Sequence, residues 1–353
     1  MTRVDAEPAV GPIDALLLVS FGGPEKPDDV VPFLENVTAG RGVPRARLEQ
    51  VAEHYLLFGG RSPLNDLNRD LISAIQKDFA DHGIDVPVYW GNRNWDPYLR
   101  DVCRDMVDDG IRRAAYFVTS AYSSYSGCRQ YRENLADATA GLPLELSRIR
   151  LYFNHPGFVT PFVEATAEAM ASTTSDAHVV FVTHSIPTGM DAASGGPGAH
   201  AYRRQHEEVA RLVAEGVGAS NWSLAYCSRS GSPHQPWLEP DINDHLRELA
   251  ADGVSSVVVV PIGFVSDHME VVFDLDTEAK TTAAELDVEF QRVATPGSHP
   301  AFVAMVRELL LERAAVDRGD EVERSVMGVC DPNPDRCADD CCPNMRLALP
   351  AVP

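Results

Sequence analysis

The sequence predicts an α/β fold with two similar Rossmann-like lobes, each a four-stranded parallel sheet flanked by helices, and a cleft between the lobes. Three observations predict this fold class. The chain has 353 residues, which suits two domains better than one. Short β-branched runs alternate with helical stretches, which is typical of βα units and of parallel sheets. These runs fall into two sets of four, so the two halves are expected to resemble each other.

The predicted elements alternate along the chain. Strands are expected at residues 13–20, 86–91, 114–120 and 147–153 in the first half, and at 178–185, 222–228, 254–261 and 288–294 in the second. Helices are expected at 63–82, 96–109, 157–172, 200–216, 239–252, 267–285 and 299–317.

The chain divides into two lobes and a tail. We expect the lobes at residues 11–155 and 176–320, followed by a cysteine-rich tail at 321–353. The first lobe carries an insertion at about 40–68, where it would form a lid or pocket wall at the carboxyl edge of the sheet. A decorative surface insertion is the alternative. The insertion combines Tyr55 and adjacent apolar residues with Arg41 and Arg61, which suits a flat apolar ligand that bears carboxylates.

Composition excludes several classes of partner. The formal net charge of −22 repels phosphate backbones and anionic lipid, so no nucleic-acid partner is expected. The longest apolar runs are far shorter than the roughly 20 residues that a membrane helix needs, so no stable membrane insertion is expected. The first residues lack the pattern of a signal peptide. We therefore expect a cytoplasmic protein.

Three carboxylates follow the apolar run VSSVVVV at intervals of four residues: Glu270, Asp274 and Glu278. In an α-helix a step of four advances about 40° beyond a full turn, so these side chains form one slowly drifting stripe. Like charges at this spacing repel one another. A solvated helix face is the alternative, but the helix offers only Lys280 in compensation. The pattern therefore favours a stripe that binds cations.

The predicted strand HVVFVTHS ends in His184, at the edge where open α/β sheets place their ligands. A lone histidine at a strand end is more often structural. Here the predicted strand at 254–261 ends at the same edge, and the carboxylates of the acidic stripe follow it directly. An imidazole that faces Glu270 could bind a divalent first-row metal or transfer protons.

Four of the seven cysteines lie in the last 24 residues: Cys330, Cys337, Cys341 and Cys342. Thiolates this dense in a reducing compartment are usually metal ligands. The C-x6-C-x3-C-C spacing fits structural zinc poorly, whereas an iron–sulfur cluster needs four thiolates with freer spacing. If the adjacent pair supplies one ligand, a fourth must come from Cys103, Cys128 or Cys227. A disordered tail with incidental thiols is the alternative.

Several motifs together resemble one family, the ferrochelatases, which insert Fe²⁺ into a porphyrin. The motifs stand in the family's order from about residue 14 to residue 313: GGRSPLN, GNRNW, THSIP, SRSGSPHQPWLEP and PIGFVSDHMEVVFDLDTE. The cysteine tail resembles the branch that carries a [2Fe–2S] cluster, with one ligand from mid-chain and three from the C-terminus. The resemblance implies Fe²⁺ as a substrate and a [2Fe–2S] cluster as a cofactor.

The resemblance also implies roles for individual residues. His184 matches the family's metal-binding and proton-accepting histidine, and Glu270 matches its partner across the porphyrin plane. Asp274 and Glu278 match an acidic path along a helix that includes a π-type turn. The positions expected around the porphyrin are Ser62, Tyr131, Tyr55, Arg41 and Phe21. Phe21 replaces a tyrosine that binds haem iron in some bacterial relatives.

For the cluster, the resemblance implies Cys128, Cys330, Cys337 and one of Cys341 and Cys342 as ligands. The choice within the adjacent pair stays open.

The substrate expected from the resemblance is coproporphyrin III. Members of the family that use protoporphyrin IX and associate with membranes have an apolar lip, and this chain lacks a similar segment. Protoporphyrin IX is the alternative substrate. A non-catalytic porphyrin or haem carrier and a cobalt chelatase are alternative functions. A downstream enzyme of the haem pathway is expected to accept the product.

Overall fold

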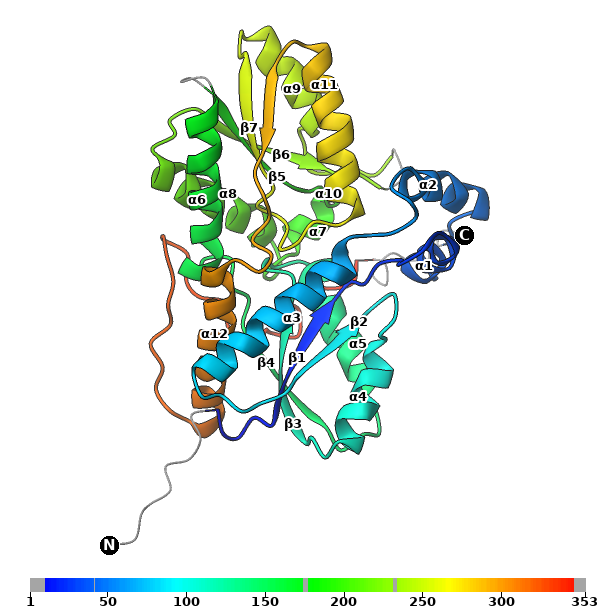
Figure 1. Ribbon diagram of the computed structural model, residues 1–353, viewed down its shortest axis with the longest axis vertical. Coiled ribbons are helices and arrows are strands. Elements are labelled where there is room, and N and C mark those ends of the chain that lie inside the picture. The colour runs from blue at the N-terminus through cyan, green and yellow to red at the C-terminus, as the bar shows by residue number, and fades with distance from the viewer. Residues whose placement is uncertain (1–9, 41, 174–176, 231–233, 346–353) are drawn as a thin grey trace, which may run out of the picture.

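The computed structural model describes residues 10–40, 42–173, 177–230 and 234–345, and it contains two parallel sheets of four strands each (Figure 1). The first sheet has the order β2-β1-β3-β4 and the second has the order β6-β5-β7-β8. The strands of the first are β1 (Ala15–Ser20), β2 (Val88–Asn92), β3 (Arg113–Val118) and β4 (Glu145–Arg148). Those of the second are β5 (His178–His184), β6 (Trp222–Cys227), β7 (Ser256–Val260) and β8 (Glu289–Arg292). The matching order confirms the predicted fold of two similar lobes.

Helices flank both sheets. The first half contains a 3-10 turn (Pro27–Asp29), α1 (Val30–Val37), α2 (Arg45–Leu57), α3 (Leu64–Asp81), α4 (Leu99–Asp108), a π-helical turn (Tyr125–Arg129) and α5 (Gln130–Thr139). The second half contains α6 (Pro156–Ser172), α7 (Thr188–Ala192), α8 (Ala201–Val217), α9 (Ile242–Ala251), α10 (Met269–Phe273), a π-helix (Asp274–Ala279), α11 (Lys280–Glu285) and α12 (Pro300–Arg318).

The two lobes share one continuous core. Central strands such as β1 and β7 are buried along their whole length, because helices cover both faces of each sheet. The helix α12, which follows the second sheet in the chain, packs against α3 and α6. Its Phe302 lies 6.1 Å from the ring of Phe117 in β3. The predicted boundary at residue 320 assigned this helix to the second lobe, yet it covers the first sheet as well.

The predicted strand at 147–153 is wrong at its end. Pairing with β3 covers Glu145 to Arg148, and the next residues are buried by other contacts. Arg150 is almost fully buried, and its guanidinium makes two hydrogen bonds to the carboxylate of Glu312 at 2.7 and 3.1 Å. Tyr152 stacks on Phe117 with ring centroids 4.8 Å apart. The apolar run is buried by side-chain packing, so its hydrophobicity did not indicate strand pairing.

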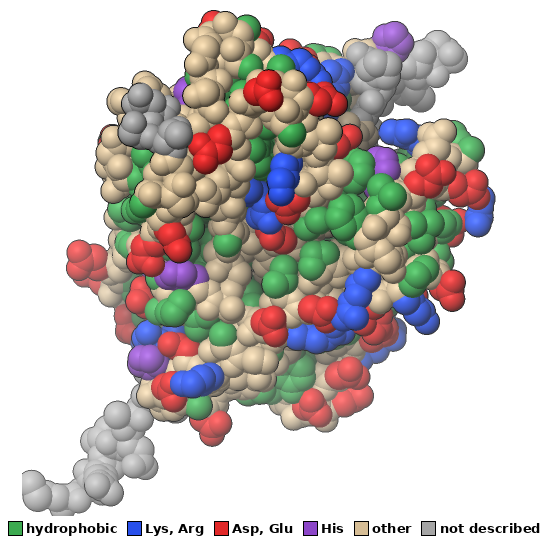
Figure 2. Space-filling model, turned by 45° about the horizontal axis from the view of Figure 1, so that its top comes forward, with side chains coloured by type: hydrophobic (Ala, Val, Ile, Leu, Met, Phe, Trp, Pro, Cys, Tyr) green, Lys and Arg blue, Asp and Glu red, His purple; other side chains and the backbone are tan. Residues whose placement is uncertain are grey.

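The predicted insertion at about 40–68 contains α2, which forms a two-helix projection with α1, the helix just before the insertion (Figure 1). The two helices build a small core of their own around Val30, Phe33 and Leu48. Leu56 and Leu57 at the end of α2 are exposed, and Figure 2 shows hydrophobic side chains gathered on the side of the face where these helices project. We name this unit, residues 30–40 and 42–57, the lid.

The tail at 319–345 contains no helix or strand and lies over both lobes. The backbone N–H of Met327 donates to the carbonyl of Asn154 at 2.8 Å, and that of Val329 donates to Glu208 at 2.6 Å. Further along, Arg129 donates to the carbonyl of Asp339 at 2.7 Å. Within the described part of the chain, none of the helices combines the length and the apolar character needed to cross a membrane.

Candidate functional site

His184 and Glu270 face each other, 3.5 Å apart between Nε2 and Oε2. His184 is the last residue of β5, and Glu270 lies in the first turn of α10, beyond the end of β7. The Nδ1 atom of His184 lies 2.5 Å from the carbonyl oxygen of Ser185. A carbonyl can only accept a hydrogen bond, so Nδ1 carries a hydrogen, and Nε2 is the ring nitrogen that faces the carboxylate. An imidazole nitrogen and a carboxylate oxygen that face each other form a site for a proton or a cation.

Buried polar side chains hold the end of β5 in place. The Tyr202 hydroxyl donates to the carbonyl of His184 at 2.8 Å and lies 3.0 Å from the Thr183 hydroxyl. Thr183 also contacts Nε2 of His206 at 2.8 Å. His206 is stacked on Tyr122 with ring centroids 3.5 Å apart, and burial lowers its pKa to about 3. His206 is therefore neutral, and the cluster positions His184 without adding charge beside it.

His268, which sequence reasoning missed, caps the helix that carries Glu270. Its Nδ1 accepts a hydrogen bond from the backbone N–H of Glu270 at 3.2 Å. Burial lowers the pKa of His268, which favours the neutral ring that can act as an acceptor. The sequence letters DHME contain a signal for this arrangement, because a side chain at the N-cap position can accept the free N–H groups of the first turn.

The acidic stripe runs from Glu270 through Asp274 to Glu278, and it crosses from α10 into the π-helix. A step of four exceeds a full turn in an α-helix but falls short of one in the wider π-helix. The two drifts oppose each other, so the carboxylates stay aligned. Burial, with help from Glu270 and Glu278, raises the pKa of Asp274 to about 7, although a hydrogen bond from Ser228 opposes this. Burial also raises the pKa of Glu278.

The lid reaches this stripe from the first lobe. The ring of His54 is stacked on that of Phe273 in α10, with centroids 4.0 Å apart and planes 10° apart. Tyr55 is near enough to Glu270 for the carboxylate to add to burial in raising the pKa of the phenol. The lid therefore contacts the second lobe directly beside the carboxylates.

Two aromatic side chains contact Arg93: Phe21, just after β1, and Tyr131, in α5. Its guanidinium carbon lies 5.4 Å from the ring centre of Phe21 and 5.0 Å from that of Tyr131. Phe21 and Tyr55 both pack against Phe33, with ring centroids 6.2 and 6.1 Å apart. Phe21, Tyr55 and Tyr131 are thus brought to one region, and Arg93, in the motif GNRNW, joins them as a cation that sequence reasoning did not assign.

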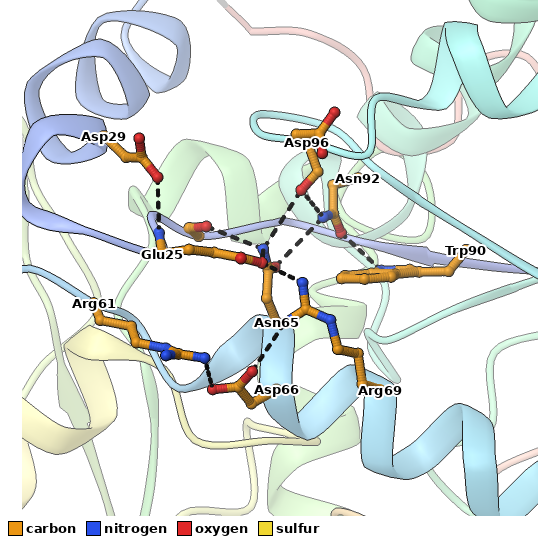
Figure 3. Close-up of polar contacts among 10 residues, drawn as sticks. Glu25, Asp29, Arg61, Asn65, Asp66, Arg69, Trp90, Asn92 and Asp96 are labelled. Atoms are coloured by element: carbon orange, nitrogen blue, oxygen red, sulfur yellow. Dashed lines mark hydrogen bonds and ion pairs between the residues drawn. The ribbon is translucent and has the colours of Figure 1, made fainter.

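Ser62, just before α3, lies beside Gly23, which is in the loop that follows β1. A Cβ atom on Gly23 would come within 2.7 Å of the Ser62 Cβ, so only glycine allows this approach. Arg41 lies outside the described residues. The loop is fixed by the buried Asn65, which donates to the carbonyl of Gly23 at 3.2 Å and to Glu25 at 2.9 Å (Figure 3).

Four of the five predicted cluster cysteines form one group. The Sγ atoms of Cys128 and Cys342 are 3.9 Å apart, and those of Cys341 and Cys342 are 3.6 Å apart. Hydrogen bonds from Cys337 and Cys342 hold the pKa of the Cys341 thiol well below its usual range. Arg148 donates to Cys337 at 2.9 Å.

Cys330 is apart from this group in the structure. Asn154 donates to its carbonyl at 2.8 Å, and Glu208 and Arg211 provide the nearby charges. Among the described residues, no set of three or more His, Cys, Asp or Glu side chains is arranged to hold a metal ion. The four grouped thiols contact one another through hydrogen bonds.

Comparisons with known proteins place the chain among relatives of one family. A family model described as ferrochelatase matches residues 13–314. The coproporphyrin III ferrochelatase of Streptomyces griseus is 57% identical over 97% of this chain and 96% of its own length. That of Frankia alni is 54% identical over 96% of this chain and 88% of its own length. The solved structure of SirB from Bacillus subtilis with Fe³⁺ has a TM-score of 0.52 and 15% identity, covering 87% and 98% of the two chains, and it supports the fold alone.

Proposed function

Because the chain belongs to the ferrochelatase family, we propose that it inserts Fe²⁺ into coproporphyrin III as a step of haem biosynthesis. The observation that carries this proposal is the pair formed by His184 Nε2 and Glu270 Oε2, 3.5 Å apart and continued by a stripe of carboxylates. The name of the Streptomyces griseus relative supports the choice of porphyrin.

Metallation removes two protons from pyrrole nitrogens while the cation forms bonds to all four nitrogens. His184 is proposed as the base that accepts a pyrrole proton, because its Nε2 lone pair is free when Nδ1 donates to Ser185. Glu270 and the stripe behind it would supply Fe²⁺ with oxygen ligands and carry a proton away. Asp274, with a pKa near 7, can hold or release a proton at the pH of the cell.

The porphyrin is proposed to lie among Phe21, Tyr55 and Tyr131, with Ser62 and Arg41 as further contacts. Flat aromatic side chains suit the macrocycle, and a guanidinium suits a propionate because it forms paired hydrogen bonds. Arg93, held over two of these rings, is proposed as a propionate partner. The names of the Streptomyces griseus and Frankia alni relatives support a substrate with four propionates over one with two.

A [2Fe–2S] cluster is proposed in the tail. Four thiols in one group meet the number that such a cluster requires, and the charge of Arg148 favours the thiolate forms of three of them, Cys128, Cys337 and Cys341. Cys128, Cys337, Cys341 and Cys342 would hold it, and it would fasten the tail to the first lobe. Cys330 is the alternative ligand to one of the adjacent pair.

The ligand set is tested by iron and sulfide content after anaerobic purification. Cys337→Ser is expected to lose both and the visible absorption of the cluster, whereas Cys330→Ser is expected to keep them. The opposite result would make Cys330 a ligand and would mean that the tail rearranges when the cluster binds. Zinc in place of iron in the wild-type protein would exclude the cluster.

We propose a cytoplasmic location and delivery of the product to a downstream enzyme of the haem pathway. All seven cysteines are free of disulfides, which suits a reducing compartment. The exposed Leu56 and Leu57, at 51% and 73% exposure, form an apolar tip on the lid beside the proposed site and would suit the contact with that enzyme.

The proposed activity is tested by anaerobic turnover with Fe²⁺, following the Soret band for coproporphyrin III and protoporphyrin IX in parallel. The wild-type protein is expected to metallate the first much faster. His184→Ala is expected to lose about 100-fold or more in kcat while it still binds porphyrin, because general base catalysis contributes about that much. His299→Ala, which removes a histidine paired with Glu164, is the control. If the wild-type protein bound porphyrin but did not insert iron, its function would be that of a porphyrin carrier and not of an enzyme.

A further inference from the structure

A groove of about 740 Å³ lies along the free edge of the first sheet. Its floor is β2, which is the edge strand in the order β2-β1-β3-β4 (Figure 1). The helices α3 and α4 form its two walls. The residues that line it are Arg69, Ile72, Ser73, Val88, Tyr89, Trp90, Val102, Asp105, Asp108 and Asp109. The groove shares no residue with the candidate site described above.

The backbone of β2 offers unused hydrogen-bonding groups to this groove. The N–H of Leu16 bonds to the carbonyl of Pro87, and the N–H of Arg93 bonds to the carbonyl of Ser20, so the odd-numbered residues of β2 face β1. The backbone N–H and C=O groups of the even-numbered residues must therefore point away from β1, toward the open edge of the sheet. In the described chain, Asn92 is the one of these whose outer N–H finds a partner, the carbonyl of Pro97 at 2.7 Å. Val88 and Trp90 remain open to an added strand.

The wall formed by α3 is apolar and electrically balanced. Val88 and Trp90 turn their side chains toward it, beside Ile72. The guanidinium of Arg69 lies over the Trp90 ring at 5.3 Å (Figure 3). Glu25 and Asp66 both pair with Arg69, so its charge is compensated.

The wall formed by α4 is acidic. Asp105, Asp108 and Asp109 are exposed, and no Lys or Arg of the described residues forms an ion pair with them. Tyr89 turns to this side and donates to Asp109 at 2.8 Å. The groove thus has one apolar wall and one wall with three exposed carboxylates that form no ion pair in the described part of the chain.

We propose that this groove binds an extended segment of a partner protein, which adds to β2 as a further strand and alternates basic with apolar side chains. Successive side chains of a strand point to opposite faces of the sheet. Apolar residues would meet Ile72 and Trp90, and lysine or arginine residues would meet the aspartates on α4. Backbone bonds to Val88 and Trp90 would fix the register, as in other complexes formed by strand addition.

A second copy of this chain fits the edge poorly. Two β2 edges paired with each other would bring their acidic α4 walls together, and the whole chain carries a net charge of −22. Charge complementarity therefore selects a basic partner segment. The inference is independent of the proposed metallation activity.

The probe is a synthetic heptapeptide of alternating lysine and valine with blocked termini, measured by calorimetry at low and at physiological salt. Its binding to the wild-type protein is compared with that to the triple variant Asp105→Asn/Asp108→Asn/Asp109→Asn. The matched control is Asp244→Asn/Glu248→Gln/Asp252→Asn, which removes three charges on and just after α9, the corresponding helix of the second lobe. A peptide N-methylated at the residues that would bond to β2 keeps its charge but cannot donate to the strand.

We expect the α4 variant to weaken binding about tenfold and the α9 variant to change it less than twofold. The N-methylated peptide is expected to bind at least tenfold more weakly, and amide exchange at Val88 and Trp90 is expected to slow in the wild-type complex. Equal loss with both triple variants, or equal binding of the methylated peptide, would reduce the interaction to net charge and overturn the proposal. A wild-type dimer that the peptide dissociates would make the occupant a second copy instead.

Discussion

Replacing Asp274 with asparagine should make the protein more stable, with a strong dependence on pH. Burial raises the pKa of this carboxyl from 3.8 to about 7, so the folded protein resists its ionisation. Below pH 3.8 both the folded and the unfolded chain hold the proton, and the carboxyl costs no stability. Between pH 3.8 and 7 the unfolded chain releases the proton first, so wild-type stability falls. Above pH 7 both states are ionised and the loss is constant.

The magnitude follows from the two pKa values. A rise from 3.8 to about 7 corresponds to at most about 4 kcal/mol, and we expect about 2 kcal/mol because the site relaxes and water reaches part of the carboxyl. Asp274→Asn keeps the shape of the side chain and can still accept the hydrogen bond from Ser228. It should therefore exceed the wild-type protein in the free energy of unfolding by about 2 kcal/mol at pH 8 and by little at pH 4.

Urea unfolding of the metal-free protein between pH 4 and pH 8 measures this difference. Asp276→Asn is a matched control on the same π-helix, because Arg292 makes two hydrogen bonds to Asp276 at 2.6 and 2.8 Å. Asp276→Asn should lower the free energy of unfolding, whereas Asp274→Asn should raise it. If Asp274→Asn were also destabilising at pH 8, or if its effect were the same at every pH, the carboxyl would not be desolvated and its role in the stripe would fail.

Three further predictions concern the surroundings of the stripe. Tyr202→Phe should lower kcat about tenfold with little change in KM, because it removes the hydrogen bond that holds the backbone of His184; steady-state kinetics measure this, and a change in KM alone would contradict it. His54→Ala should raise the porphyrin dissociation rate severalfold by breaking the stack between lid and α10; an unchanged rate in stopped-flow experiments would mean that the stack does not retain the ligand. Gly263→Ala should lower the melting temperature and abolish turnover, because a Cβ there would lie 2.7 Å from that of Thr183; normal melting and turnover would contradict it.

The sequence predicted the strands well because each is a short apolar run between helical stretches. Full burial of β1 and β7 gives them the continuous hydrophobic character of strands covered on both faces. The run LYF after β4 has the same character, yet it is buried by ring stacking and by the ion pair of Arg150. Apolar content reports burial, and pairing depends on a neighbour that the local sequence does not reveal.

The lid helices escaped prediction for a related reason. The sequence of α2, RARLEQVAEHYLL, buries only Leu48 and Ala52, and several of its apolar residues are exposed. A helix with a narrow buried face has a weak periodic signal. The position of the insertion could be predicted from the wide spacing between the first two predicted strands, but its fold depends on contacts with Trp95 and Phe273 from elsewhere in the chain.

Part of the candidate site could be predicted because parallel strands deliver their carboxyl ends to one edge of a sheet. This rule brings His184 and the start of the acidic helix together. It says nothing of Tyr202 or Arg93, which contribute through contacts between distant parts of the chain. For the tail, spacing offered both Cys330 and Cys342, and only the three-dimensional path of the chain shows which thiols meet.

The acidic stripe explains why stability and the proposed function should conflict at this site. Three carboxylates lie on one helix face, and the first lies 3.5 Å from Nε2 of His184. Without a cation, the carboxylates repel one another, and Asp274 lowers the repulsion by keeping its proton near neutral pH. A divalent cation would convert each unfavourable contact into a favourable one and would expel that proton. Iron binding should therefore raise the stability of the wild-type protein more than that of Asp274→Asn, so the variant that is more stable when empty should gain less from the metal.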